Sequence, residues 1–97
     1  MITHVVMFKL HDTVDKKDVA QEIKMRLDSL PAKIDVIKTF EVGLNVLESA
    51  RSYDMVLVST FESLETLAVY SKHPDHVAHL DFIRNASASI MAVDYGS

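Results

Sequence analysis

The chain contains no cysteine and no tryptophan, and only two glycines and two prolines occur among its 97 residues. The absence of cysteine excludes disulfides, thiolate catalysis and cysteine-held metal sites, and it is typical of proteins in a reducing compartment. No apolar run approaches the roughly 20 residues that a membrane-spanning helix needs, and the first residues lack the basic segment of a signal peptide. We therefore expect a cytoplasmic protein that has no membrane partner.

Positive charge is also scarce, with 10 Lys and Arg against 14 Asp and Glu, which gives a formal net charge of −4. No cluster of basic residues and no interleaving of basic with aromatic residues is present, so a nucleic-acid partner is not expected. Hydrophobic residues make up 48% of the chain, a generous share for a length that corresponds to one small domain. We expect residues 1–97 to form that single domain.

The hydrophobic pattern predicts four strands and three helices. Alternating apolar residues indicate strands, and apolar residues three or four apart indicate helices. Asp15 and Ser63 are suited to cap the first and second helices, and Pro74 is suited to begin the third. The expected elements in chain order are a strand over 2–10, a helix over 15–29, a strand over 34–45 with a bulge or bend at Gly43, a hairpin loop over 46–53, a strand over 54–61, a helix after Ser63, a helix after Pro74 and a strand over 90–95.

This order predicts an α+β fold of the ferredoxin-like, split βαβ type, in which helices cover one face of a four-stranded antiparallel sheet. The other face of the sheet carries apolar residues such as Val5 and Met7. Uncovered apolar sheet faces usually mark association surfaces. We therefore expect a homodimer in which two sheets pack face to face, as in a dimeric α+β barrel.

The segment from Tyr70 to His76 holds the most chemistry of any part of the chain. Proline disfavours helical backbone in the residue before it, so one helix should end near His73 and the next should begin at Pro74. His76 falls on the same helical stripe as Leu80 and Ile83 and should point inward. Imidazole has the only side-chain pKa near neutrality, about 6.5, so this junction is the first place to look for acid–base catalysis.

Several segments together resemble the stress-responsive α/β-barrel (Dabb) family. They are the opening stretch 2–10, the strand segment 40–45, the strand-to-helix segment 61–63, Tyr70 and the His-Pro segment 73–76. The resemblance spans nearly the whole chain in the same order. It implies a dimeric α+β barrel built from two ferredoxin-like sheets. Most bacterial members of this family have no assigned activity, but the family includes a plant polyketide cyclase, olivetolic acid cyclase.

In that cyclase, a tyrosine and a histidine of this helix junction act as an acid–base pair, which implies catalytic roles for Tyr70 and His76 here. The resemblance also places His4 at the same site. We expect a small apolar or aromatic ligand to be bound by the following residues: His4, Val6, Phe8, Ile23, Leu57 and His73. The side chains of the first helix are less aromatic than in the cyclase, so the same substrate is not expected.

Two functions from different classes follow. The first is a cofactor-free cyclase, isomerase or lyase that acts on a small apolar or aromatic carbonyl compound through a histidine and a tyrosine. The second is a dimeric binding or stress-associated module whose histidines line a pocket without catalysing a reaction. A weaker third possibility comes from the small monooxygenases and haem-binding proteins that share this barrel, although no histidine lies in a recognisable axial setting.

Each site residue also has a purely structural interpretation. His4 can be a satisfied core histidine, Tyr70 can pack on the sheet with its hydroxyl on a backbone carbonyl, and His73 can cap a helix. The spacing of His73, His76 and His79 allows two of them to chelate a metal but not three, so no metal site is expected there. A hard cation held by the carbonyls of 31–37 would leave almost no trace in the sequence.

Overall fold

A computed structural model describes all of residues 1–97, with four strands and three helices that follow one another in the expected order. No helix has the length and apolar content that crossing a membrane would require. The elements are β1 (Ile2–Leu10), α1 (Lys16–Asp28), β2 (Thr39–Leu44), β3 (Met55–Phe61), α2 (Leu64–Lys72), α3 (Pro74–Ala86) and β4 (Ser87–Gly96).

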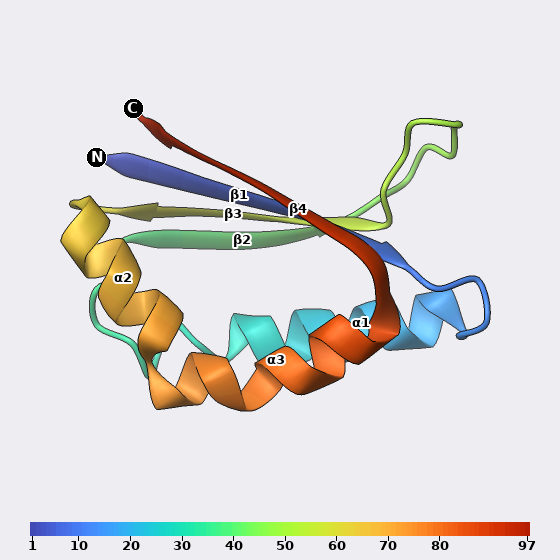
Figure 1. The fold of residues 1–97 in the computed structure, drawn as a ribbon, viewed down its shortest axis with the longest axis horizontal. Helices are drawn as coiled ribbons and strands as arrows, with labels where there is room; N and C mark the ends of the chain where they lie inside the picture. Colours follow the sequence, from blue (N-terminus) through green and yellow to red (C-terminus); the bar gives the residue numbers. More distant parts are fainter.

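The strands form one antiparallel sheet in the order β2-β3-β1-β4. The three helices lie together on one side of this sheet, and both termini lie at the same end of it (Figure 1). This arrangement is the ferredoxin-like fold predicted from the sequence. It places the beginning of β1 and the end of β4 side by side, because the two strands pair antiparallel along nearly their whole length.

Local sequence signals set the helix boundaries. Asp15 accepts a hydrogen bond from the backbone N–H of Asp18 and so caps α1. The side chain of Ser63 caps α2 in a reciprocal arrangement with Thr66. α2 ends at Lys72 and is followed by the extended residue His73, and Pro74 occupies the first turn of α3. The two helices therefore meet at a sharp corner, which brings the end of one against the start of the other.

Three sequence expectations about the strands are wrong in detail. β2 begins at Thr39 rather than at residue 34, because the preceding backbone forms turns that start from the end of α1, with the N–H of Ile34 bonded to the carbonyl of Leu30. Gly43 is not at a bulge, since the pairing of β2 with β3 is regular; the register shift lies at Lys9 and Leu10 instead. β4 begins at Ser87, three residues earlier than expected.

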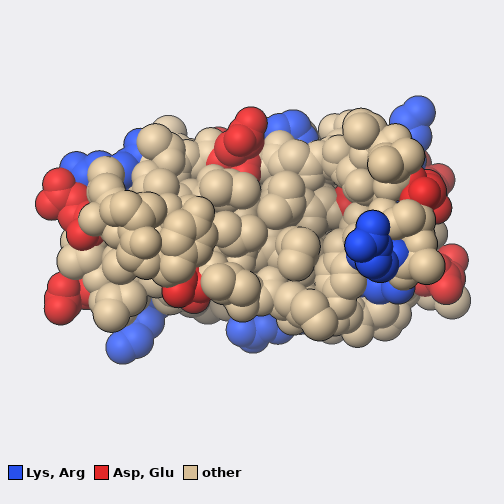
Figure 2. All heavy atoms as spheres, turned by 90° about the horizontal axis from the view of Figure 1, so that it is seen from above, with Lys and Arg blue, Asp and Glu red and all other residues tan.

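The two faces of the sheet differ in exposure. The face toward the helices carries the hydrophobic core, which includes Phe61 and Leu10. The opposite face is covered by no part of the chain, although it is rich in apolar side chains: Val5, Met7, Val56, Val58, Met91, Val93 and Tyr95. Figure 2 looks down on this open face and shows it as largely uncharged, with Lys, Arg, Asp and Glu gathered mainly around its rim. A side chain such as Val93, 60% exposed, is unfavourably placed in an isolated chain.

Candidate functional site

A small cavity of about 140 Å³ lies between the sheet and the helices α2 and α3. It brings together six of the eight site residues expected from the sequence, while Ile23 and His73 lie outside it. Ile23 is fully buried in the core, and His73 caps α3. The lining residues are His4, Val6, Phe8, Leu27, Leu57, Tyr70, His76, Leu80, Ile83, Arg84 and Ile90.

Tyr70 lies at the back of this cavity, near the end of α2. Its side chain is 1% exposed and packs against Phe61, with the ring centroids 5.1 Å apart. Its hydroxyl is buried and has no hydrogen-bond partner in the protein, which is rare because an unpaired buried hydroxyl costs about 1–3 kcal/mol. Burial raises the pKa of Tyr70 well above its usual value. The group is therefore a neutral phenol with a free donor.

His76 stands beside Tyr70 in the first turn of α3, with the two ring centroids 4.4 Å apart. Its Nδ1 lies 2.9 Å from the carbonyl oxygen of Ser71. Because a carbonyl only accepts, Nδ1 carries the proton and Nε2 keeps its lone pair. Burial is the main cause that lowers the pKa of His76, and the nearby His4 and Arg84 lower it further. The hydrogen bond to Ser71 opposes these effects but is outweighed. The structure thus favours a neutral imidazole with one open nitrogen.

His4 forms the third polar group of the cavity. Its side chain is 16% exposed, and its ring centroid lies 6.2 Å from that of Tyr70. Its Nδ1 bonds to the carboxylate of Asp94, which stands directly opposite on β4 in the antiparallel register. The carboxylate therefore fixes the orientation of the ring, as second-layer carboxylates commonly do for histidines. The structure thus places His4 beside Tyr70, with most of its side chain covered.

Asp94 and Arg84 were not identified from the sequence. The signal for Arg84 was present, because it follows His76 and Leu80 at steps of four residues along α3 and so shares their face. The sequence carries no such signal for Asp94, because its contact with His4 depends on the exact pairing of β1 with β4. Pairing one residue away would have turned Asp94 to the other face of the sheet.

The three histidines of the junction do not converge on a common point. Nδ1 of His73 accepts the N–H of Asp75, 3.1 Å away, and so caps α3. His76 bonds to Ser71, and Nδ1 of His79 lies 3.2 Å from a guanidinium nitrogen of Arg26. No group of three or more His, Asp or Glu side chains is arranged to hold a metal ion.

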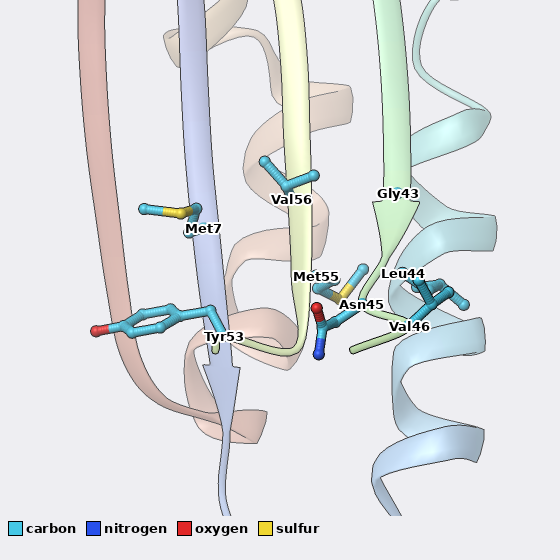
Figure 3. A pocket seen from close by; sticks show the side chains of 8 residues that line it. All are labelled: Met7, Gly43, Leu44, Asn45, Val46, Tyr53, Met55 and Val56. Atoms are coloured by element: carbon cyan, nitrogen blue, oxygen red, sulfur yellow. The ribbon is translucent and has the colours of Figure 1, made fainter. Parts of the chain in front are cut away.

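A larger hollow of about 330 Å³ lies on the open face of the sheet, at the base of the loop between β2 and β3. Figure 3 shows its lining, which is mostly apolar: Met7, Gly43, Leu44, Asn45, Val46, Tyr53, Met55 and Val56. The hydroxyl of Tyr53 lies 3.0 Å from that of Ser89 and ties the end of the loop to β4. This hollow contains no histidine or carboxylate, so it belongs to the apolar open face rather than to the acid–base cavity.

Comparisons with known proteins agree with this fold. The family model of the stress responsive A/B barrel domain matches residues 2–97. A stress-response A/B barrel domain-containing protein of Arabidopsis thaliana is 34% identical over 96 residues, which cover 98% of this chain and 36% of that protein. The chain thus spans only about a third of the length of this relative.

Solved structures are similar over the whole chain. A protein of unknown function from Bacteroides fragilis, described as dimeric and ferredoxin-like, has a TM-score of 0.89 and 36% identity, with 99% of this chain and 95% of that chain covered. A hydroxynitrile lyase from Passiflora edulis has a TM-score of 0.82 at 17% identity, with 97% and 90% covered, and shares the fold alone. The match of the family model to nearly every residue, together with these likenesses, shows that the chain belongs to the stress-responsive A/B barrel domain family.

Proposed function

We propose that the protein is a cofactor-free enzyme that moves a proton next to a carbonyl group of a small apolar or aromatic compound. The observation that carries the proposal is the orphan hydroxyl of Tyr70 beside the open nitrogen of His76, in a cavity that is otherwise mostly apolar. A ligand carbonyl oxygen would supply the acceptor that the hydroxyl lacks. The reaction class is that of a cyclase, isomerase or lyase.

In this proposal the two side chains divide the chemistry between them. Nε2 of His76 takes a proton from the carbon next to the carbonyl, and the C–H electrons move into the carbonyl to give an enolate oxygen. The O–H of Tyr70 donates to that oxygen and stabilises its charge. The resulting imidazolium returns the proton to another carbon in an isomerase or to a departing group in a lyase. In a cyclase, the enolate carbon attacks a second carbonyl of the same molecule, whose oxygen takes the proton.

The His4–Asp94 pair is suited to support this step from the sheet side. Its carboxylate holds Nδ1 of His4, so that the other ring nitrogen is available to a ligand or to the phenol. In this proposal His4 lies against the bound ligand, and Asp94 is a positioning residue. Val6, Phe8 and Leu57 form the apolar wall that excludes water from the enolate.

The fold of this family is compatible with catalysis, since the structurally similar Passiflora protein is a hydroxynitrile lyase. Its low identity transfers no activity to this chain. The alternative, a binding or stress-associated module, would use the same cavity without proton transfer. The Arabidopsis relative carries a stress-response name that fits either function.

We further propose that the protein is a cytoplasmic homodimer joined through the open face of the sheet. The Bacteroides protein is described as dimeric. An apolar centre with a charged rim (Figure 2) is the usual anatomy of a stable interface. The loop between β2 and β3 rises from the sheet on the side away from the helices (Figure 1) and exposes Val46 and Leu47, so it extends this face.

The proposed function is tested by hydrogen–deuterium exchange of small ketones in D₂O, followed by proton NMR. The wild type should accelerate exchange of the protons next to the carbonyl. His76→Ala should lower that acceleration by about 10² to 10⁴-fold, and the exposed His11→Ala should leave it unchanged. If ketones bind but neither exchange nor turnover occurs across a broad panel of carbonyl compounds, the protein is a binding module.

A further inference from the structure

The acid–base cavity has one charged side chain in its wall that the proposed mechanism does not use. Arg84 lines the cavity and is nevertheless exposed, so it lies where the cavity meets solvent. It forms no ion pair with any carboxylate of the chain, in contrast to Arg26, which is held by Glu22. The cavity therefore offers a free guanidinium at its entrance.

The position of Arg84 relative to His76 is set by the helix that carries both. The two residues are eight positions apart on α3, a rise of about 12 Å. Helical side chains lean toward the N-terminus of their helix, and the positive charge of Arg84 lowers the pKa of His76, so the two side chains act on the same cavity. A ligand whose carbonyl meets Tyr70 would occupy the cavity that Arg84 also lines.

The size of the cavity limits the ligand between these two ends. A cavity of about 140 Å³ is close in size to an engineered apolar cavity of roughly 150 Å³ that binds benzene. The walls between the two polar ends are aliphatic and aromatic, from Phe8, Leu57, Leu80 and Ile83 among others. One six-membered ring, or an aliphatic body of similar size, fits this space.

We propose that the substrate of this site is a compact carbonyl compound, no larger than one ring in its apolar body, that carries a carboxylate or similar anionic group at the end opposite its carbonyl. The inference rests on the proposed function for the location of the carbonyl end. It adds a specificity residue, Arg84, which binds the anionic group by charge-assisted hydrogen bonds. The exposed setting of Arg84 limits the strength of this contact.

The test uses 4-acetylbenzoate and 4-acetylbenzamide, which share the acetyl group and the ring and differ in charge. Their dissociation constants are measured by NMR titration of the whole protein. The wild type should bind the benzoate about tenfold more tightly than the benzamide, and Arg84→Gln should abolish this preference. Arg51→Gln, in the exposed loop between β2 and β3, should leave it intact, and high salt should weaken it.

The same samples separate this inference from the proposed function. Exchange of the acetyl protons in D₂O reports proton abstraction, whereas the benzoate preference reports Arg84. If the two probes bind equally, or if the preference persists in Arg84→Gln, the proposal that Arg84 binds an anionic substrate is overturned even when exchange occurs. If neither probe binds, the proposal that the cavity accepts a ligand with one ring is overturned. Binding with the expected preference but without exchange supports the role of Arg84, and the catalytic proposal is overturned as well if the broad panel of carbonyl compounds also shows neither exchange nor turnover.

Discussion

The rings of Tyr70 and His76 lie with their centroids 4.4 Å apart and their planes inclined by 34°. The corner between α2 and α3 creates this contact, because Tyr70 precedes the extended residue His73 and His76 follows Pro74. Neither side chain satisfies its remaining polar atom within the protein: the hydroxyl of Tyr70 has no partner, and His76 uses only Nδ1. The pair therefore presents one free donor and one free acceptor to the same cavity.

The orphan hydroxyl predicts a conflict between stability and function at Tyr70. Tyr70→Phe removes a buried unpaired group and should raise the free energy of unfolding by about 1 kcal/mol. The same change should lower ketone exchange by about 10²-fold, because the donor to the enolate oxygen is lost. Chemical denaturation and the exchange assay measure the two effects on one variant.

Tyr53→Phe is the matched control for this change, because the hydroxyl of Tyr53 has a partner in Ser89. It should lower stability by roughly 1 kcal/mol and leave exchange unchanged. A loss of stability in Tyr70→Phe similar to that in the control would show that the hydroxyl of Tyr70 is satisfied in solution.

His76 predicts a pH dependence of stability. Its pKa in the folded protein is lowered, chiefly by burial, so the unfolded chain binds the proton more readily. The contribution of neutral His76 is fully present above the unfolded pKa of about 6.5 and is lost as the pH falls from there to the folded value. The free energy of unfolding of the wild type, minus that of His76→Gln, should therefore decrease from pH 7.5 to pH 5. A difference that is flat or rises toward low pH would contradict the lowered pKa.

The pair of His4 and Asp94 predicts an effect of charge on ring orientation. Asp94→Asn keeps an acceptor of the same shape but removes its negative charge. The hydrogen bond from Nδ1 of His4 to this side chain should therefore weaken. Nitrogen-15 NMR of the imidazole should then show a mixture of tautomers where the wild type shows one. Asp81→Asn, at an exposed position of α3, serves as the control. An unchanged His4 spectrum would remove Asp94 from the site.

The open sheet face predicts that a buried charge separates the dimer. Val93→Asp places a carboxylate among the apolar side chains of the open face, beside Val5 of the neighbouring strand, where desolvation on dimerisation is unfavourable. Sedimentation equilibrium should show a dimer for the wild type and a monomer for the variant. Leu64→Asp is the matched control, because Leu64 is similarly exposed, at 64% against 60% for Val93, but lies on the helical side. A monomeric wild type would overturn the dimer proposal.

The sequence by itself determined the order of the elements and the inward face of α3. Ser63, Pro74 and the spacing of His76, Leu80 and Ile83 act within one helix or its first turn, so local chemistry decides them. The sequence pattern predicts too early a start for β2, because Ile34 and Val36 alternate like strand residues. Ile34 is instead buried in a turn after α1, where its side chain joins the core.

Tertiary structure alone decided which residues meet in the cavity. Asp94 reaches His4 through the register of strands 90 residues apart in the chain. The inward face of α1 puts Leu27 at the cavity and Ile23 in the closed core, although both have the same helical spacing. The ring of Tyr70 packs against aromatic side chains of three strands and of α3, and the hydroxyl is left without a partner among them. Periodicity predicts which way a side chain faces, but only the packed neighbours decide whether its polar atom finds a partner.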